Sequence, residues 1–244
     1  MPGRATPQLA GWGGLSVPGR ELRSEHLAEV ARGRSLTRGL GRSYGDSALP
    51  PPGVTTVAGS SRADRILALD PAAPRLRAEA GLSLRDLVWA LLPRGLFPPV
   101  VPGTQYVTLG GMVAADVHGK NHHVDGTIGR HVTALRLLTA AGEIVDCSRE
   151  RLPDLFRATL GGMGLTGHLL EVELALARIP SPWIVQETQR VAHLDEMLAA
   201  LAGSARDWPF TVCWLDALAA GRALGRGVLI RGRWAAPAEA PDQD

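Results

Sequence analysis

The sequence has few cysteines, almost no lysine, no membrane-length apolar run and little net charge. Cys147 and Cys213 lie far apart and fit no C-x-x-C pattern, which argues against a disulfide framework and predicts free thiols. Apolar runs such as 88–92 are far too short to cross a membrane. No basic segment followed by an apolar one opens the chain, so we expect no cleavable signal peptide and, by default, a cytoplasmic location; membrane association and a periplasmic location are the alternatives.

A net charge of +2 does not predict nucleic-acid binding. The basic residues are unusual in another way, because Lys120 is the only lysine among 26. Arginine and lysine differ most at buried or geometrically tight sites, where a compact ammonium is not replaceable by a planar guanidinium. Two interpretations stay open: chance survival in an arginine-rich chain, or a functional need for an ammonium at this position.

Periodicity predicts a mixed α+β chain. The clearest helix begins at Ser83, which forms a capping box with Asp86, and ends at Gly95. Strict alternation over 168–177 predicts a half-exposed strand in an antiparallel sheet. Further helices are expected at 25–32, 153–160 and 194–201. Further strands are expected at 35–37, 54–57, 65–69, 75–79, 132–139, 143–147, 183–191, 210–215 and 228–233.

The Pro180-Ser181-Pro182 segment is the best candidate for a domain boundary. We therefore expect one mixed domain over residues 1–180 and a fragment of a second over 181–234. Residues 235–244, rich in alanine, proline and acidic residues, are expected to be disordered.

Three glycine-rich segments, 38–46, 102–111 and 161–167, are the main candidates for a binding site. Glycine permits positive φ and lets several backbone N–H groups converge on one anion. One loop seldom supplies enough donors for a pyrophosphate, so three such loops in one domain predict a large cofactor threaded between them. The alternative is three ordinary tight turns.

Two other motifs are weaker, and a third is absent. Residues 162–167 match G-x-G-x-x-G, but a helix precedes them and a strand follows, the reverse of a dinucleotide-binding βαβ unit. No G-x-S-x-G elbow of a serine hydrolase is present. Asp116, His118 and His122 could form a metal site, although Gly119 and Asn121 disfavour the helix that would align them.

Four strings together carry a resemblance to a known family: RGLGRSYGD (38–46), PGTQYVTLGG (102–111), DVHGKNHH (116–123) and GGMGLTG (161–167). They resemble the FAD domain of the vanillyl-alcohol oxidase and p-cresol methylhydroxylase (PCMH) superfamily, and the similarity runs over residues 11–233. The resemblance implies a two-subdomain PCMH-type FAD-binding domain at 1–180. It also implies the N-terminal part of a substrate (cap) domain with an antiparallel sheet at 181–234.

The resemblance also implies site residues. His118 and Lys120 would lie on the substrate side of the flavin as the catalytic residues, and no metal is expected. Members that tether FAD carry a histidine where this chain has Arg42, so non-covalent FAD is implied. The cofactor-binding residues would be Arg38, Gly39, Leu40, Gly41, Arg42, Ser43, Tyr44, Gly45, Asp46, Ser47, Gly103, Thr108, Leu109, Gly110, Gly111, Ala115, Asp116, Val117, His118 and Leu169.

Within the superfamily the strings are most similar to an oxidase branch of actinobacterial cell-wall synthesis. This implies oxidation of the 2'-OH of a polyprenyl-phosphate pentose to a ketone, with hydride passing to flavin N5. The implied partners are that lipid-linked sugar and a separate short-chain reductase. The chain is short for this branch, so a truncated or split homologue that needs a complementing chain is the first alternative. A metal-dependent hydrolase built on the histidine string is the second.

Overall fold

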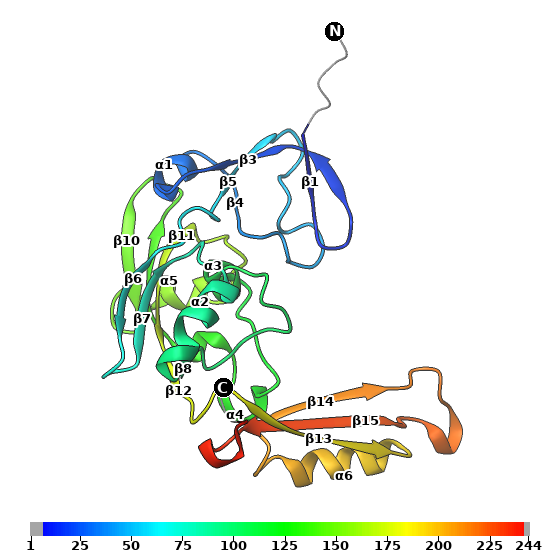
Figure 1. Ribbon diagram of the computed structural model, residues 1–244. Coiled ribbons are helices and arrows are strands. Elements are labelled where there is room, and N and C mark those ends of the chain that lie inside the picture. The colour runs from blue at the N-terminus through cyan, green and yellow to red at the C-terminus, as the bar shows by residue number, and fades with distance from the viewer. Residues whose placement is uncertain (1–6, 242–244) are drawn as a thin grey trace.

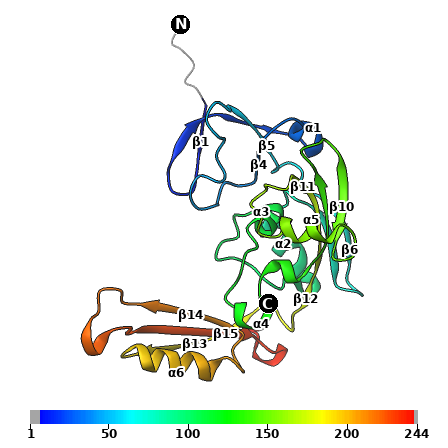
Figure 2. The same ribbon diagram turned by 180° about the vertical axis from the view of Figure 1, so that it is seen from behind.

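The structure is a computed structural model that describes residues 7–241, and it mixes helices with β-sheets, as the sequence predicts. Figure 1 shows three parts in succession along the chain. An N-terminal sheet region comes first, then a central sheet covered by helices, then a C-terminal sheet backed by one helix. The view from behind in Figure 2 shows the same order.

The N-terminal part consists of a hairpin and a small parallel sheet. The hairpin pairs β1 (Gln8–Ala10) with β2 (Ser16–Pro18), and the sheet has the order β3-β5-β4. Its elements are β3 (Arg20–Arg23), α1 (Leu27–Ala31), β4 (Thr37–Arg38) and β5 (Thr56–Gly59). Helix α1 buries Leu27 and Ala31 against Ala58 and the central sheet, which joins the two parts.

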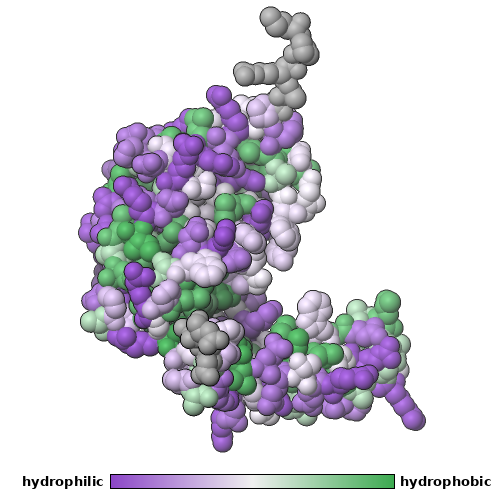
Figure 3. Space-filling model, viewed as in Figure 1, coloured by the Kyte–Doolittle hydropathy of each residue, from purple (hydrophilic) through white to green (hydrophobic). Residues whose placement is uncertain are grey.

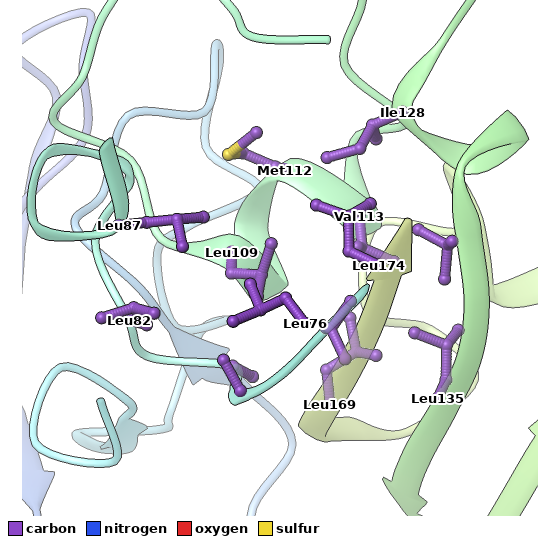
Figure 4. Close-up of a cluster of buried hydrophobic side chains, with 14 of the residues drawn as sticks. Leu76, Leu82, Leu87, Leu109, Met112, Val113, Ile128, Leu135, Leu169 and Leu174 are labelled. Atoms are coloured by element: carbon purple, nitrogen blue, oxygen red, sulfur yellow. The ribbon is translucent and has the colours of Figure 1, made fainter. Parts of the chain in front are cut away.

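The central part is a five-stranded antiparallel sheet of order β10-β9-β11-β7-β6. One face is apolar because every second residue of its strands points inward, as Leu135 and Leu137 do in β9. Figure 4 shows Leu76 and Leu174 of the sheet beside Leu109 and Val113 of a covering helix, and all four belong to one buried cluster. The strands are β6 (Ile66–Asp70), β7 (Arg75–Glu79), β9 (Val132–Leu138), β10 (Ile144–Ser148) and β11 (His168–Ala175), and the covering helices are α2 (Leu84–Leu91), α3 (Leu109–Ala114) and α5 (Pro153–Thr159).

The opposite face of this sheet is charged. Glu171 lies 2.6 Å from Arg77 on β7 and 3.7 Å from Arg136 on β9, and Arg136 pairs in turn with Asp146 on β10. The predicted antiparallel, half-exposed sheet is therefore confirmed. The helix predicted from Ser83 is also confirmed, since Ser83 Oγ accepts a hydrogen bond from Asp86 N and Gly95 has a positive φ of 65°.

The C-terminal part has the strand order β13-β15-β14, with α6 packed on one face. Its elements are β13 (Ile184–Val191), α6 (Leu194–Ser204), β14 (Phe210–Leu215), the 3₁₀ turn Gly221–Ala223 and β15 (Gly227–Trp234). Its contacts with the rest include the Trp234 ring, which meets the Phe97 ring edge-on at 5.1 Å, and Thr211 N, which donates to Lys120 O. Figure 3 shows the surface hollowed between this part and the body above it.

The remaining elements are short: the 3₁₀ turns Leu92–Arg94, Ile128–Arg130 and Pro237–Glu239, the strand pair β8 (Leu96–Phe97) and β12 (Ala177–Arg178), and α4 (His122–Asp125). Within residues 7–241, no helix has the length and apolar character needed to span a bilayer.

The end of the chain differs from the predicted disordered tail over 235–244. Ala235 is buried and bonded to Trp183 and Ser181, and Glu239 pairs with Arg233 at 2.7 Å. These contacts give residues 235–241 a defined path that their composition does not predict; residues 242–244 lie outside the described part.

Candidate cofactor site

A cavity of about 680 Å³ lies where the three glycine-rich segments meet. This volume falls within the roughly 300–1,000 Å³ of typical small-molecule and cofactor sites. The N-terminal hairpin and the start of β11 complete its walls. The segments predicted to share one cofactor do enclose a common space.

The first glycine-rich segment leaves β4 and packs directly on the second. A Cβ atom on Gly39 would lie 2.5 Å from Thr108 Oγ1, so only glycine permits this approach. Gly41 has a φ of 66°, and a Cβ atom there would collide with the guanidinium of Arg38. The turn after β4 therefore requires glycine at both positions.

The most informative feature of this segment is a row of free donors. The backbone N–H groups of five consecutive residues, 40–44, donate to no acceptor within residues 7–241. All five residues line the cavity. Successive N–H groups of a turn can converge on an anion, and backbone donors without a protein acceptor bind water or a ligand. The residues present therefore fit the pyrophosphate of FAD.

Arg38 lines the cavity, yet its charge is directed elsewhere. Nε donates to Glu21 Oε1 at 2.8 Å, and the two Nη atoms donate at 2.6 Å to the carbonyl oxygens of Ala48 and Ala10. Only 9% of the Arg38 side chain and 8% of the Glu21 side chain are exposed. Arg38 thus ties together β3, the hairpin and the far end of the glycine-rich loop.

The second segment ends in α3, whose first turn forms one wall. Thr108 caps this helix by accepting a hydrogen bond from Gly111 N at 3.2 Å. Gly110 packs on the backbone of Ala80 at a distance that a side chain would not allow. Gly111, in contrast, is exposed to the cavity, and a Cβ atom there would meet only Thr108 Oγ1.

The third segment docks on the other end of α3. Gly161 N donates to Val113 O and Met163 N donates to Ala114 O at 2.8 Å. Met163 has a φ of 51° and Asp116 a φ of 41°, two of the three non-glycine residues with positive φ among residues 7–241. Such backbone strain persists where surrounding structure enforces it, often at functional sites.

The structure brings together most of the predicted cofactor residues. Those that line the cavity are Arg38, Gly39, Leu40, Gly41, Arg42, Ser43, Tyr44, Ser47, Gly103, Thr108, Gly110, Gly111, Ala115, Val117 and Leu169. Those that lie outside its lining are Gly45, Asp46, Leu109, Asp116 and His118. Leu109 is fully buried in the core, and Asp116 Oδ1 accepts a hydrogen bond from Gly129 N, so both support the wall from behind.

Sequence reasoning missed several lining residues, among them Trp12 and Met163. A signal existed for both, because each stands alone between glycines in a segment with no periodicity. Apolar residues such as Ala80 carry no comparable signal, since core positions look the same.

The predicted catalytic residues lie on the loop that leads from the cavity to the C-terminal part. Val117 lines the cavity, and His118 follows it. The backbone of His118 forms an isolated antiparallel bridge with Thr127, and its ring meets the His122 ring edge-on, with the ring centres 5.6 Å apart. Lys120 is exposed. Its backbone carbonyl is the one that accepts from Thr211 on β14.

Buried Asn121 fixes the conformation of this loop by donating to Pro99 O and Asp125 Oδ2. Over residues 7–241, no three histidine, cysteine, aspartate or glutamate side chains are grouped so that they could hold a metal ion. Since Asp116 is bonded to Gly129 instead, the geometry gives the metal hypothesis no support.

His168 joins two walls of the cavity. Its Nε2 lies 3.0 Å from Arg34 O, so Nε2 carries the proton, and Nδ1 accepts from Thr37 Oγ1 at 2.7 Å. Burial lowers the pKa of His168 below its usual 6.5, only partly opposed by the bond to Arg34.

We predict that this histidine makes the apoprotein less stable in acid. The unfolded chain takes up a proton near pH 6.5 while the folded chain resists it, so the contribution is present above pH 6.5 and is lost as the pH falls. Urea denaturation at pH 7.5, 6.5 and 5.5 should show a falling midpoint, with a shallower fall in His168→Gln. His123→Gln is the control for the loss of one histidine, since exposed His123 makes no side-chain hydrogen bond within residues 7–241. Equal slopes in all three proteins would contradict the assignment.

Comparison with known proteins identifies the family. A family model described as an FAD binding domain matches residues 26–148. Decaprenylphosphoryl-beta-D-ribose oxidase of Mycolicibacterium smegmatis is 38% identical over 94% of this chain and 50% of its own length. An uncharacterised protein of Streptomyces coelicolor is 39% identical over 66% of this chain and 43% of its own length. L-gulonolactone oxidase of Bos taurus is 33% identical over 55% of this chain and 30% of its own length.

The chain thus spans half or less of the length of these curated relatives. The family match covers the first and second glycine-rich segments and the histidine loop, and the alignment with the mycobacterial oxidase extends over nearly all of the chain. The predicted resemblance is confirmed. The chain belongs to the PCMH-type FAD-binding domain family, and FAD is its cofactor.

Proposed function

We propose that this chain holds FAD without a covalent bond in the cavity and forms the FAD-binding part of a sugar-oxidising oxidoreductase. The observation that carries the proposal is the row of unpaired N–H groups at residues 40–44, in a cavity walled by three glycine-rich segments. Non-covalent binding is supported by the lining itself. Over residues 7–241 it contains no histidine or cysteine, and Arg42 stands at the position that the resemblance assigns to the tether.

The proposed substrate is a polyprenyl-phosphate pentose whose secondary 2'-alcohol becomes a ketone. Support comes from the mycobacterial relative, whose name specifies a decaprenylphosphoryl ribose. FAD would supply the acceptor for the two electrons of the alcohol. His118 would orient the hydroxyl, and Lys120, exposed and without an acidic partner within residues 7–241, would meet the phosphate.

We further propose the domain assignment: residues 1–180 as a two-subdomain FAD domain and 181–234 as the first part of a substrate domain. The antiparallel β13-β15-β14 sheet supports it, because it is joined to the rest by few contacts. One of those contacts is the hydrogen bond from Thr211 N to Lys120 O, which links the proposed substrate domain to the loop that carries Lys120. A short-chain reductase that consumes the ketone is the proposed downstream partner.

An absorbance spectrum tests the proposal directly. The purified protein, reconstituted with FAD and desalted, should show flavin absorption, and heat precipitation should release all flavin into the supernatant. Adding a polyprenyl-phosphate pentose without oxygen should then bleach the flavin. A protein that never retains FAD would refute the binding proposal, and flavin that stays in the precipitate would refute the non-covalent one.

A second candidate is an FAD-binding chain that oxidises sugar only with a complementing polypeptide. It is favoured by the face of β13-β15-β14 opposite α6, where apolar side chains such as Val212, Trp214 and Ile230 lie without a covering layer among residues 7–241. Flavin that is bound but bleaches only when a second polypeptide is added would select this candidate.

Lys120→Met tests the substrate side. We predict unchanged FAD affinity and a substrate KM raised at least about tenfold, because a lost charged contact to phosphate costs about 1.5–3 kcal/mol. FAD titration and flavin bleaching rates measure the two effects, with exposed Arg130→Met as a control for loss of a nearby cation. If Lys120→Met lost FAD binding while Arg130→Met kept it, Lys120 would have a structural role and not a substrate-binding one.

A further inference from the structure

The N-terminal hairpin lies outside the segment matched by the FAD-binding family model, which begins at residue 26. It is nevertheless anchored beside the cavity. Leu9 and Val17 pack with Leu49 and Val57, and the carbonyl of Ala10 accepts a hydrogen bond from Arg38. The hairpin therefore has a fixed position next to the first glycine-rich loop.

The turn of the hairpin reaches the loop itself. A Cβ atom on Gly11 would lie 3.1 Å from Gly45 O, so the two backbones are close to contact. Trp12 follows Gly11 and lines the cavity, with 56% of its surface exposed. A large indole is thus held at the cavity wall without being buried by the protein.

Arg42 completes this surface. Its guanidinium carbon lies 5.7 Å from the centre of the Trp12 ring, within the range of a cation–π contact. Within residues 7–241, Arg42 has no hydrogen bond and no acidic partner, whereas Arg38, four residues earlier, is fully engaged. The two arginines of the loop therefore have different roles: Arg38 fixes the loop, and Arg42 faces the cavity with an available charge.

We infer that Trp12 and Arg42 together form a binding surface for a ring system of FAD, so that the hairpin is part of the cofactor site. An indole with a stacked guanidinium offers a flat apolar face and a positive charge, which suits a planar ring that carries polar edges and lies near phosphates. The inference rests on the proposed FAD binding and adds the residues that recognise the rings.

The test is an FAD titration, followed by flavin fluorescence, of wild type, Trp12→Ala and Trp89→Ala. Trp89 is another exposed indole, on α2 and outside the cavity lining, which makes it a suitable control. Loss of one stacked ring should weaken FAD binding at least about tenfold in Trp12→Ala. Trp89→Ala should bind as wild type does. Thermal unfolding of the apoproteins checks that both variants fold.

Competition with ADP locates the ring. If Trp12→Ala weakens the binding of ADP and of FAD alike, the surface binds the adenine ring. If it weakens the binding of FAD alone, the surface binds the flavin ring. Both outcomes support the inference. Arg42→Gln should weaken binding of the same ligands as Trp12→Ala does. The double variant should lose less binding free energy than the sum of the two single losses, because the two residues act as a pair.

Equal FAD affinity in wild type and Trp12→Ala would overturn the inference while leaving the proposed function intact. Failure of the wild type to bind FAD would overturn both. The two failures are therefore distinguishable in one titration series.

Discussion

Gly111→Val is expected to weaken FAD binding at least about 100-fold, equivalent to about 2.8 kcal/mol. Gly111 is exposed to the cavity from the first turn of α3, so a valine would project two methyl groups into the space that the cofactor needs. Its Cβ atom would meet only the Thr108 hydroxyl, at 3.2 Å, which leaves the protein interior undisturbed. Valine also has a higher helix propensity than glycine, so the helix itself is not weakened.

The control is Gly203→Val on α6. Gly203 is also a helical, exposed glycine, and no atom lies within 4 Å of a Cβ atom there. Fluorescence titration with FAD should give wild-type affinity for Gly203→Val, an intermediate loss for Gly111→Ala and the full loss for Gly111→Val. Thermal unfolding of all three apoproteins should stay close to wild type. Wild-type FAD affinity in Gly111→Val would show that the cofactor does not pass this wall.

Much of the fold is predictable from local pattern. The alternation of β11, the Ser83 cap of α2 and the β9–β10 hairpin each depend on residues close in sequence, and each is found where expected. The glycine-rich segments were also predictable as candidates for a binding site, because segments with several glycines and no apolar periodicity rarely form part of a hydrophobic core.

What escaped prediction depends on contacts between distant segments. Helix α3 has only six residues, two of them glycines, so it is too short for its apolar spacing to predict a helix; it is stabilised by the Thr108 cap and by burial of Leu109, Met112 and Val113. The order at Ala235 depends on Trp183 and Ser181, more than fifty positions away. The role of Arg38 was equally hidden, since an arginine in a phosphate-binding string looks like a phosphate ligand until its partners are seen.

Those partners make Arg38→Met the substitution with the largest expected effect on stability. The variant leaves the carbonyls of Ala48 and Ala10 without their donor and removes one of the two cations on Glu21. Breaking a buried ion pair by removing one partner typically costs about 3–5 kcal/mol. Urea denaturation of the apoprotein should show a decrease of that size in the free energy of unfolding.

Arg23→Gln is the matched control, because Arg23 pairs with the same carboxylate at 2.7 Å but is 53% exposed. Exposed pairs contribute only about 0–1 kcal/mol, so this variant should be close to wild type. Similar stability of Arg38→Met and Arg23→Gln would show that Arg38 does not brace the loop.

Arg38→Lys separates charge from geometry. A lysine keeps the positive charge, but its single ammonium cannot reproduce the fork that reaches Glu21, Ala48 and Ala10 from three nitrogens. We therefore expect Arg38→Lys to recover only part of the stability lost in Arg38→Met. Its FAD affinity should also be lower than that of the wild type, because residues 40–44 line the cavity and Arg38 holds their loop through Ala48 and Ala10. Full recovery by lysine would mean that the charge alone matters, and that the loop keeps its shape without the three-way bridge.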